Sequence, residues 1–246
     1  MTDRPILFSG PMVRAILNGQ KTQTRRVQKR PSWAAPIVDA EQDADGIWGL
    51  PAKNGCWSAL PIPQIGDRLW VQETWADVNW EGAPAIAFRA DESLRDLMDE
   101  PEFLDHDKSF NYDDRRLAYG KHGLGFACWS SDLLNGIEGS WRSARFMPRW
   151  VSRLTLTVTD VRVQRLQEIG GEDCIAEGVD CSTCAASWSV GRSACNQRGC
   201  FEIRQNFRTL WDSLNAKRGF GWDLNPWVAA YSFTVERRNI DGAHNG

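Results

Sequence analysis

The chain has 246 residues, 42% hydrophobic and 25% charged, so it is long enough to bury a sizeable core. Its net charge of -3 gives no overall attraction to nucleic acid, so polynucleotide binding would need a local basic patch. No apolar run approaches the ~20 residues that cross a membrane, and no signal-type apolar segment follows the N-terminus. We therefore expect a cytoplasmic globular protein that does not span a membrane.

The chain is expected to begin with a short strand over Ile6–Phe8 and a helix that ends at Asn18. Pro11 suits the first turn of that helix, and Gly19 suits the left-handed position just after it. The segment from Thr24 to Gln28 is then expected to be extended. Four residues whose side chains can bind anions or take part in catalysis follow the helix: Lys21, Thr24, Arg25 and Arg26.

The next third of the chain has weak periodicity. Residues 31–64 are rich in Pro, Gly, Asp and Trp and predict an irregular excursion with at most one hairpin, around Gly46. Residues 77–140 predict an insertion that holds a strand at Ile86–Arg89 and a short helix at Glu92–Met98.

Between these excursions, Arg68–Trp75 predicts a strand in which Glu73 shares a face with Leu69 and Val71. A carboxylate on an apolar face is either paired with a cation or kept partly protonated by desolvation. The alternative is that Glu73 lies at the exposed end of the strand.

The last third of the chain is the most regular. The strongest strand pattern runs from Leu154 to Leu166, where apolar and polar residues alternate and β-branched residues are common. Helices are predicted at Gly171–Glu177, stopped by Gly178, and at Phe201–Leu214. A closing strand follows at Trp227–Val235, and the last ten residues are expected to be unstructured. The pattern as a whole predicts an α+β fold.

Several of these segments resemble the ASCH domain family, a branch of the PUA-like β-barrels. The matching stretches are Gly19-Gln-Lys-Thr-Gln-Thr-Arg-Arg26, Gly66-Asp-Arg-Leu-Trp-Val-Gln-Glu-Thr-Trp75, Met147-Pro-Arg-Trp-Val-Ser-Arg153 and Asn225-Pro-Trp-Val228. The chain is most similar to the long ASCH proteins of tailed phages and prophages. The resemblance implies a single PUA-like barrel over residues 1–246 with flanking helices. Long insertions are expected at about 31–64, 77–140 and a Cys-rich loop at 180–201.

The resemblance also implies an activity. Lys21, Thr24 and Glu73 coincide with the base, nucleophile and acid of the ASCH-fold N4-acetylcytidine amidohydrolases of bacteria. A Thr hydroxyl needs a nearby base to attack a carbonyl, and a buried Lys can be that base if burial and adjacent cations lower its pKa. A desolvated Glu could protonate the departing amine. The candidate substrate-binding residues are Phe8, Ser9, Arg26 and Arg149.

The spacing of Lys21 and Thr24 is compatible with more than one geometry. The two side chains lie on one side if the turn is helical and on opposite faces if it is fully extended. In the alternative interpretation, Lys21 caps helix carbonyls, Thr24 is an ordinary strand residue and the cluster binds phosphate.

A second group of candidate residues is Cys181, Cys184, Cys195 and Cys200. Four thiols that begin with Cys-x-x-Cys predict a structural zinc site, although the later spacings are not those of a standard zinc ribbon. The alternative is a loop of free, reduced cysteines. No cofactor is expected for catalysis.

Three functions are therefore open from the sequence. The first is hydrolysis of the N4-acyl amide of a nucleoside or nucleobase, and the second is an RNA- or DNA-binding PUA-like module or ribonuclease. The third is a phage accessory protein. Nucleic-acid binding, if present, is expected to be weak and to use the basic groups Arg25, Arg26, Lys29, Arg30, Arg142, Arg145, Arg149 and Arg153. The oligomeric state is left open.

Overall fold

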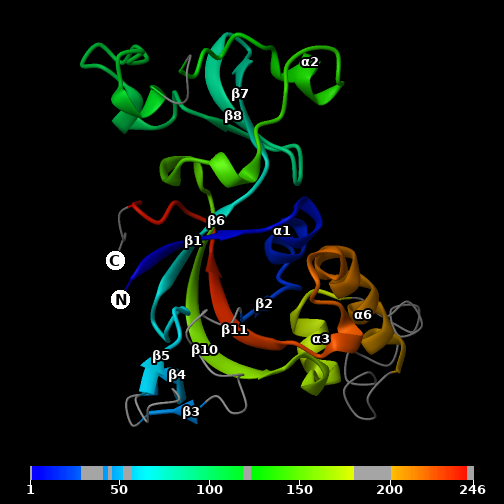
Figure 1. Ribbon diagram of the computed structural model, residues 1–246. Helices are drawn as coiled ribbons and strands as arrows, with labels where there is room; N and C mark the ends of the chain where they lie inside the picture. The colour runs from blue at the N-terminus through cyan, green and yellow to red at the C-terminus, as the bar shows by residue number, and fades with distance from the viewer. Residues whose placement is uncertain are drawn as a thin grey trace, which may run out of the picture. The chain divides into compact units, whose positions relative to one another are not determined.

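The computed structural model describes residues 2–28, 41–43, 46–51, 57–118, 123–179 and 201–242. It is a mixed α+β structure, as the sequence predicts (Figure 1). By their internal contacts the residues divide into two compact units. The first comprises residues 1–4, 15–68 and 156–235, and the second comprises residues 5–14, 69–155 and 236–246. Among the described residues, no helix has the length and apolar character to cross a bilayer.

The largest sheet has five strands in the order β1-β6-β10-β11-β2. Its strands are β1 Asp3–Leu7, β6 Arg68–Gln72, β10 Thr155–Arg165, β11 Trp227–Glu236 and β2 Gln23–Val27. The predictions for all five are confirmed within a few residues. Strands β1 and β2 are the edges of this sheet, and its described strands do not close into a barrel.

Strand β2 lies antiparallel to β11, with Thr24 opposite Tyr231 and Arg25 opposite Ala230. Before it, helix α1 (Gly10–Leu17) ends one residue earlier than predicted. Gly19 has a φ of 69°, a left-handed conformation that glycine adopts without strain, and its N–H donates to the Ile16 carbonyl at 3.0 Å. The chain thereby turns sharply from α1 toward Lys21.

In the first unit, helices α3 (Gly171–Ala176) and α6 (Phe201–Asn215) pack together (Figure 1). Both were predicted, and both contribute apolar side chains to one buried cluster. Its members are Leu166, Ile169, Cys174, Val179, Ile203, Phe207, Trp211, Trp222 and Val228. Short 3-10 helices frame this cluster: η5 Leu166–Glu168, η7 Ala216–Arg218 and η8 Trp222–Leu224.

The first unit also contains a small sheet of three strands, β3 Glu41–Gln42, β4 Trp48–Pro51 and β5 Trp57–Ala59. The predicted hairpin is the β3–β4 pair, in which Gly46 has a φ of 78°. Strand β5 was not predicted.

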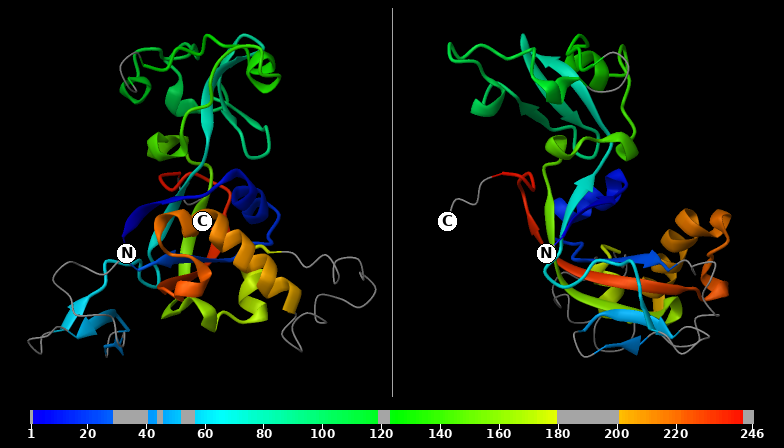
Figure 2. Two further views of the ribbon diagram at one scale, coloured as in Figure 1. Left: turned by 45° about the vertical axis from the view of Figure 1, so that its right-hand side comes forward. Right: turned by 60° about the vertical axis from the view of Figure 1, so that its left-hand side comes forward.

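The second unit is built on an antiparallel sheet of β7 (Trp75–Trp80), β8 (Ala83–Phe88) and β9 (Leu94–Asp96), with helix α2 (Ser130–Leu134) against β7 (Figure 2). The helix predicted at Glu92–Met98 is wrong. Glu92 has a φ of 60°, and Leu94 to Asp96 pair with Ala87 to Ala85 of β8. The partner strand therefore overrides the helical preference of these residues.

Much of the second unit is held together by aromatic packing and short 3-10 helices. Phe103 stacks with Phe110 at a ring distance of 6.3 Å, and Trp150 lies 5.1 Å from Phe103. The 3-10 helices are η1 Pro101–Phe103, η2 Arg115–Leu117, η3 Ala144–Phe146 and η4 Arg149–Val151.

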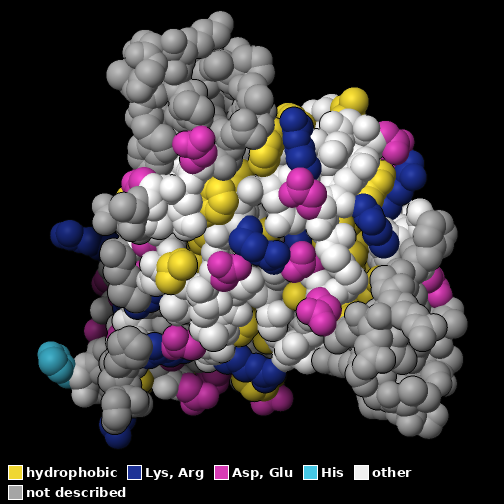
Figure 3. Space-filling view, turned by 90° about the horizontal axis from the view of Figure 1, so that it is seen from below, with side chains coloured by type: hydrophobic (Ala, Val, Ile, Leu, Met, Phe, Trp, Pro, Cys, Tyr) yellow, Lys and Arg dark blue, Asp and Glu magenta, His cyan; other side chains and the backbone are white. Residues whose placement is uncertain are grey.

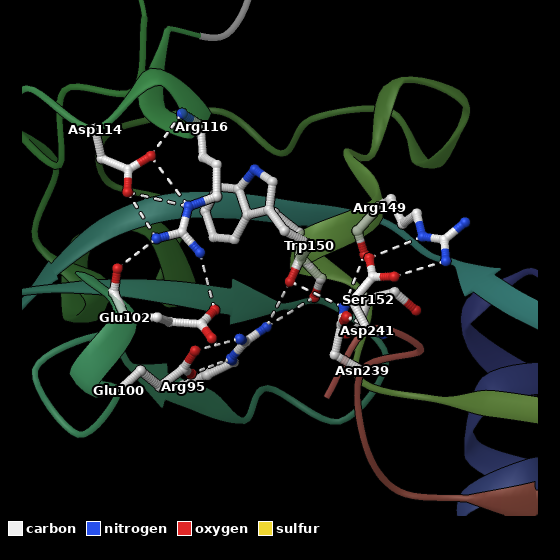
Figure 4. Close-up of polar contacts among 11 residues, drawn as sticks. Arg95, Glu100, Glu102, Asp114, Arg116, Arg149, Trp150, Ser152, Asn239 and Asp241 are labelled. Carbon is white, nitrogen blue, oxygen red and sulfur yellow. Dashed lines mark hydrogen bonds and ion pairs between the residues drawn. The ribbon is translucent and has the colours of Figure 1, made fainter. Parts of the chain in front are cut away.

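Residues 237–242 were expected to be unstructured, but they pack on η4 in the second unit. The Asn239 amide donates to the carbonyls of Arg149, Trp150 and Ser152 at 2.8, 3.1 and 2.7 Å (Figure 4). Arg149 also pairs with Asp241 through two bonds of 2.8 and 2.6 Å. These contacts satisfy carbonyls at a helix end, and polar composition alone does not reveal them.

Candidate functional site

The main chain of Lys21 is fixed by three different elements of the first unit. Its N–H donates to the Ala15 carbonyl of α1 at 3.0 Å, and Lys21 forms a β-bridge with Glu177. The next residue, Thr22, donates to the Ala176 carbonyl at 2.8 Å and accepts from the Phe233 N–H at 2.9 Å. Lys21 is therefore held where the ends of α1 and α3 meet strand β11.

The side chain of Lys21 is completely buried, with 0% exposure. Its Nζ donates to the Glu177 carbonyl at 2.8 Å and to Glu177 Oε2 at 2.7 Å. Burial lowers the pKa of Lys21 because it disfavours the charged amine, and Glu177 opposes this while Arg26 and Arg25 add to it. Burial with adjacent cations was one interpretation of Lys21 from the sequence, and capping of a helix carbonyl was the other. The structure contains both features.

Arg25 shares the Glu177 carboxylate with Lys21. Its Nη1 lies 3.0 Å from Glu177 Oε1, and its Nη2 lies 2.8 Å from Asp173 Oδ2. The other oxygen of Asp173 accepts from Arg162 at 2.7 Å. The result is a chain of alternating charges in which Lys21 is the fully buried end.

Glycine at position 178 brings Glu177 against Lys21. Gly178 has a φ of 82° and ends helix α3 as predicted. A Cβ at this position would lie 3.1 Å from both the Ala15 Cβ and the Lys21 Cβ. A larger residue would push α3 away from Lys21, so Gly178 is needed for its conformation and for this close approach.

Thr24 is buried in β2, with 3% exposure. Because side chains alternate along a strand, Thr24 and Arg26 share the face opposite to that of Arg25. Tyr231, across from Thr24 on β11, is also buried, which raises the pKa of its hydroxyl to about 12. The Arg26 charge contributes to the lowered pKa of Lys21, whose amine binds the same Glu177 carboxylate as Arg25.

Glu73 belongs to the second unit and is 1% exposed, so the interpretation as an exposed strand end is wrong. Arg153 binds both of its oxygens, Nε to Oε1 at 2.8 Å and Nη2 to Oε2 at 2.9 Å. The same guanidinium contacts Asp91 at 2.9 Å and lies 4.1 Å from the centre of the Phe88 ring. Burial raises the pKa of Glu73, and the hydrogen bonds and charge of Arg153 oppose that rise.

No family model, curated protein or solved structure matches this chain.

The candidate substrate-binding residues lie in different places. Phe8 is buried in the second unit, where its N–H donates to the Gln72 carbonyl at 3.0 Å. The Ser9 carbonyl accepts the first bond of α1, from Val13 at 2.9 Å. Arg149 is bound to Asp241 in the second unit, whereas Arg26 is half-buried in the first.

The four cysteines predicted to bind zinc, Cys181, Cys184, Cys195 and Cys200, lie outside the described residues. Within the described part of the chain, no group of three or more His, Cys, Asp or Glu is arranged to hold a metal ion. The zinc site stays a prediction.

Sequence reasoning missed the partners of both candidate catalytic groups. Glu177 is 156 residues from Lys21, and Arg153 is 80 residues from Glu73. One signal was available, because Asp173 and Glu177 are four residues apart and share a face of the predicted helix. Two carboxylates on one helix face indicate a cationic partner, and here that partner is Arg25.

Proposed function

We propose that the protein is an amidohydrolase that cleaves the N4-acyl amide of acylated cytosine or cytidine, on a PUA-like fold of the ASCH type. The proposal rests on the environment of the Lys21 amine. This amine is fully buried, it is bound by Glu177, and its pKa is lowered. An ordinary surface lysine is protonated at neutral pH and cannot accept a proton. A lysine with a lowered pKa is the base that a Thr nucleophile requires.

The proposed reaction proceeds through an acyl-threonine. The Thr24 hydroxyl adds to the carbonyl carbon of the amide and gives up its proton to Lys21. The C–N bond then breaks, and the cytosine amine leaves with a proton, for which the ASCH resemblance assigns Glu73 as donor. Burial shifts the pKa of Glu73 upward, which is the direction that a proton donor requires, and Arg153 opposes that shift. Water then hydrolyses the ester to release the carboxylic acid and restore Thr24.

Nucleic-acid binding is the weaker alternative because many basic groups already have acidic partners. Arg142 lies 2.6 Å from Asp77, Arg149 is bound by Asp241, and Arg153 is bound by Glu73 and Asp91. On the face in Figure 3, acidic and basic side chains are interspersed among the described residues. Such pairing leaves little charge to neutralise phosphates, so we propose a small nucleoside or nucleobase as the substrate.

The test is the change in ultraviolet absorption when N4-acetylcytidine is incubated with the protein. Lys21→Arg should abolish turnover, because a guanidinium stays protonated at any usable pH. Thr24→Ser should keep part of the activity and Thr24→Val almost none, since only Ser retains a nucleophilic oxygen. Thr22→Val is the matched control, because Thr22 is exposed and two residues away in the same segment.

Absence of turnover by the wild-type protein on N4-acetylcytidine, N4-acetylcytosine and their longer-chain acyl analogues would refute the proposal. Wild-type turnover that survives Lys21→Arg would refute the assignment of the base.

A further inference from the structure

The Lys21 amine is the fully buried end of a network of charged side chains. From Lys21 the network runs through Glu177, Arg25 and Asp173 to Arg162, which also pairs with Asp160 at 3.3 Å. Arginine keeps its charge in proteins, so Arg25 offsets part of the negative charge that Glu177 presents to Lys21. A protonated Lys21 would add a further charge at the fully buried end of the network, and such a charge is costly away from water.

Arg25 is the member that connects the two carboxylates. Its side chain is fully buried, and separate nitrogens contact Glu177 at 3.0 Å and Asp173 at 2.8 Å. Its Nη1 also donates to the Gln23 side chain. Glu177 therefore offers one oxygen to Arg25 and the other to Lys21, at 2.7 Å.

We infer that Arg25 is the positioning residue for Lys21: by binding one oxygen of Glu177 and balancing its charge, it leaves Lys21 on the other oxygen as a neutral amine. For its catalytic consequence this inference rests on the proposed function. Arg25 acts on Lys21 through Glu177 and does not itself contact a substrate.

Three charged groups surround the Lys21 amine: Glu177 after α3, and Arg25 and Arg26 on β2. Burial lowers the pKa of Lys21 most, Glu177 raises it, and the two arginines lower it. Loss of Arg25 would remove one of the two cations and would leave the full charge of Glu177 to Lys21. Both changes favour the protonated amine, so the pKa of Lys21 should rise.

The experiment is an NMR titration of protein labelled with ¹³C at the lysine ε-carbons. The chain has six lysines, and the signal missing from Lys21→Arg identifies Lys21. In the wild type, Lys21 should titrate below the ordinary lysine value of about 10.4. In Arg25→Met its pKa should rise by about one unit or more, which is the usual effect of a nearby charge. The rising limb of the kcat/KM profile against pH should move upward by the same amount.

Arg162→Met is the matched control, because it removes the same charge beside Asp173 but does not contact Glu177. It should shift Lys21 by less than half as much as Arg25→Met does. If Arg25→Met does not fold, Arg25→Lys keeps a cation that cannot bind both carboxylates, and a smaller upward shift is expected.

An ordinary titration of Lys21 in the wild type would overturn the inference. So would an unchanged Lys21 pKa in a folded Arg25 variant, or an equal shift in Arg162→Met. The NMR result does not depend on turnover, so a protein inactive on acylated cytidine would refute the proposed function and leave this test intact.

Discussion

Replacing Arg153 by methionine would leave the Glu73 carboxylate buried without its main cationic partner. Met has a similar length and can keep the packing on Phe88, so the change removes the charge and little of the volume. Glu73 is 1% exposed and the Arg153 side chain 17%, so water could replace only part of the lost contact.

The expected loss of stability comes from the Glu73 charge, which stays buried after its partner is removed. Removing one partner of a buried ion pair destabilises a protein by about 3–5 kcal/mol, because the other charge stays buried and unpaired. With a urea dependence of roughly 2–3 kcal/mol per molar, this is a fall of about 1–2.5 M in the unfolding midpoint.

The loss of stability caused by Arg153→Met should depend on pH. The folded pKa of Glu73 is already raised by burial, and without Arg153 it rises further. Between the unfolded value of about 4.3 and this higher folded value, the folded state binds more protons, so stability falls as pH rises. The difference between variant and wild type should therefore be smallest at acid pH, below the unfolded pKa, and largest near pH 8.

The assay is urea unfolding followed by tryptophan fluorescence at pH 4, 6 and 8. The double variant Arg153→Met with Glu73→Gln should recover most of the loss, because no buried charge remains. Arg208→Met is the control: its pair with Asp223 is exposed and should contribute less than about 1 kcal/mol. A loss below about 1 kcal/mol for Arg153→Met at pH 8, or a loss that does not vary with pH, would refute the reasoning.

Three further predictions can be measured by similar means. Gly178→Ala should destabilise the protein by about 1–3 kcal/mol through left-handed strain and the close contacts at its Cβ, whereas Gly170→Ala, with open space at its Cβ, should change stability by less than about 1 kcal/mol. Asn239→Ala should cost about 1–3 kcal/mol in urea unfolding, because the carbonyls of residues 149, 150 and 152 each lose one hydrogen-bond donor. Metal analysis of protein purified without chelator should give close to one zinc per chain, lost in the double variant Cys181→Ser with Cys184→Ser; folded protein without zinc would contradict this.

Local patterns were sufficient for the elements whose sequence preference and packing agree. β10 alternates apolar and polar residues, α6 has an apolar stripe, and both were predicted nearly to their ends. The segment Glu92–Met98 shows the limit of such patterns, because residues 94–96 pair with the preceding strand β8 instead of forming the helix that their composition favours. Strand pairing can override the intrinsic preference of a segment, so composition within the segment alone did not reveal it.

The same limit applies to the site. The burial of Glu73 was predicted from its alternation with Leu69 and Val71, although β6 ends at Gln72, one residue before Glu73. The environment of Lys21 was predicted only from the adjacent arginines, and the decisive partner, Glu177, lies beyond the reach of any local pattern.

The contacts of Asn239 and Asp241 with η4 have a consequence for the order of events during protein synthesis. The second unit takes its first residues from positions 5–14 and its last from positions 236–246. A ribosome delivers the chain from the N-terminus, so the hydrogen bonds that Asn239 donates to the carbonyls of residues 149, 150 and 152 cannot form until residue 239 has emerged. We expect nascent chains stalled before residue 236 to be far more sensitive to protease between residues 69 and 155 than full-length chains stalled with a C-terminal extension long enough to bring residue 241 out of the ribosome.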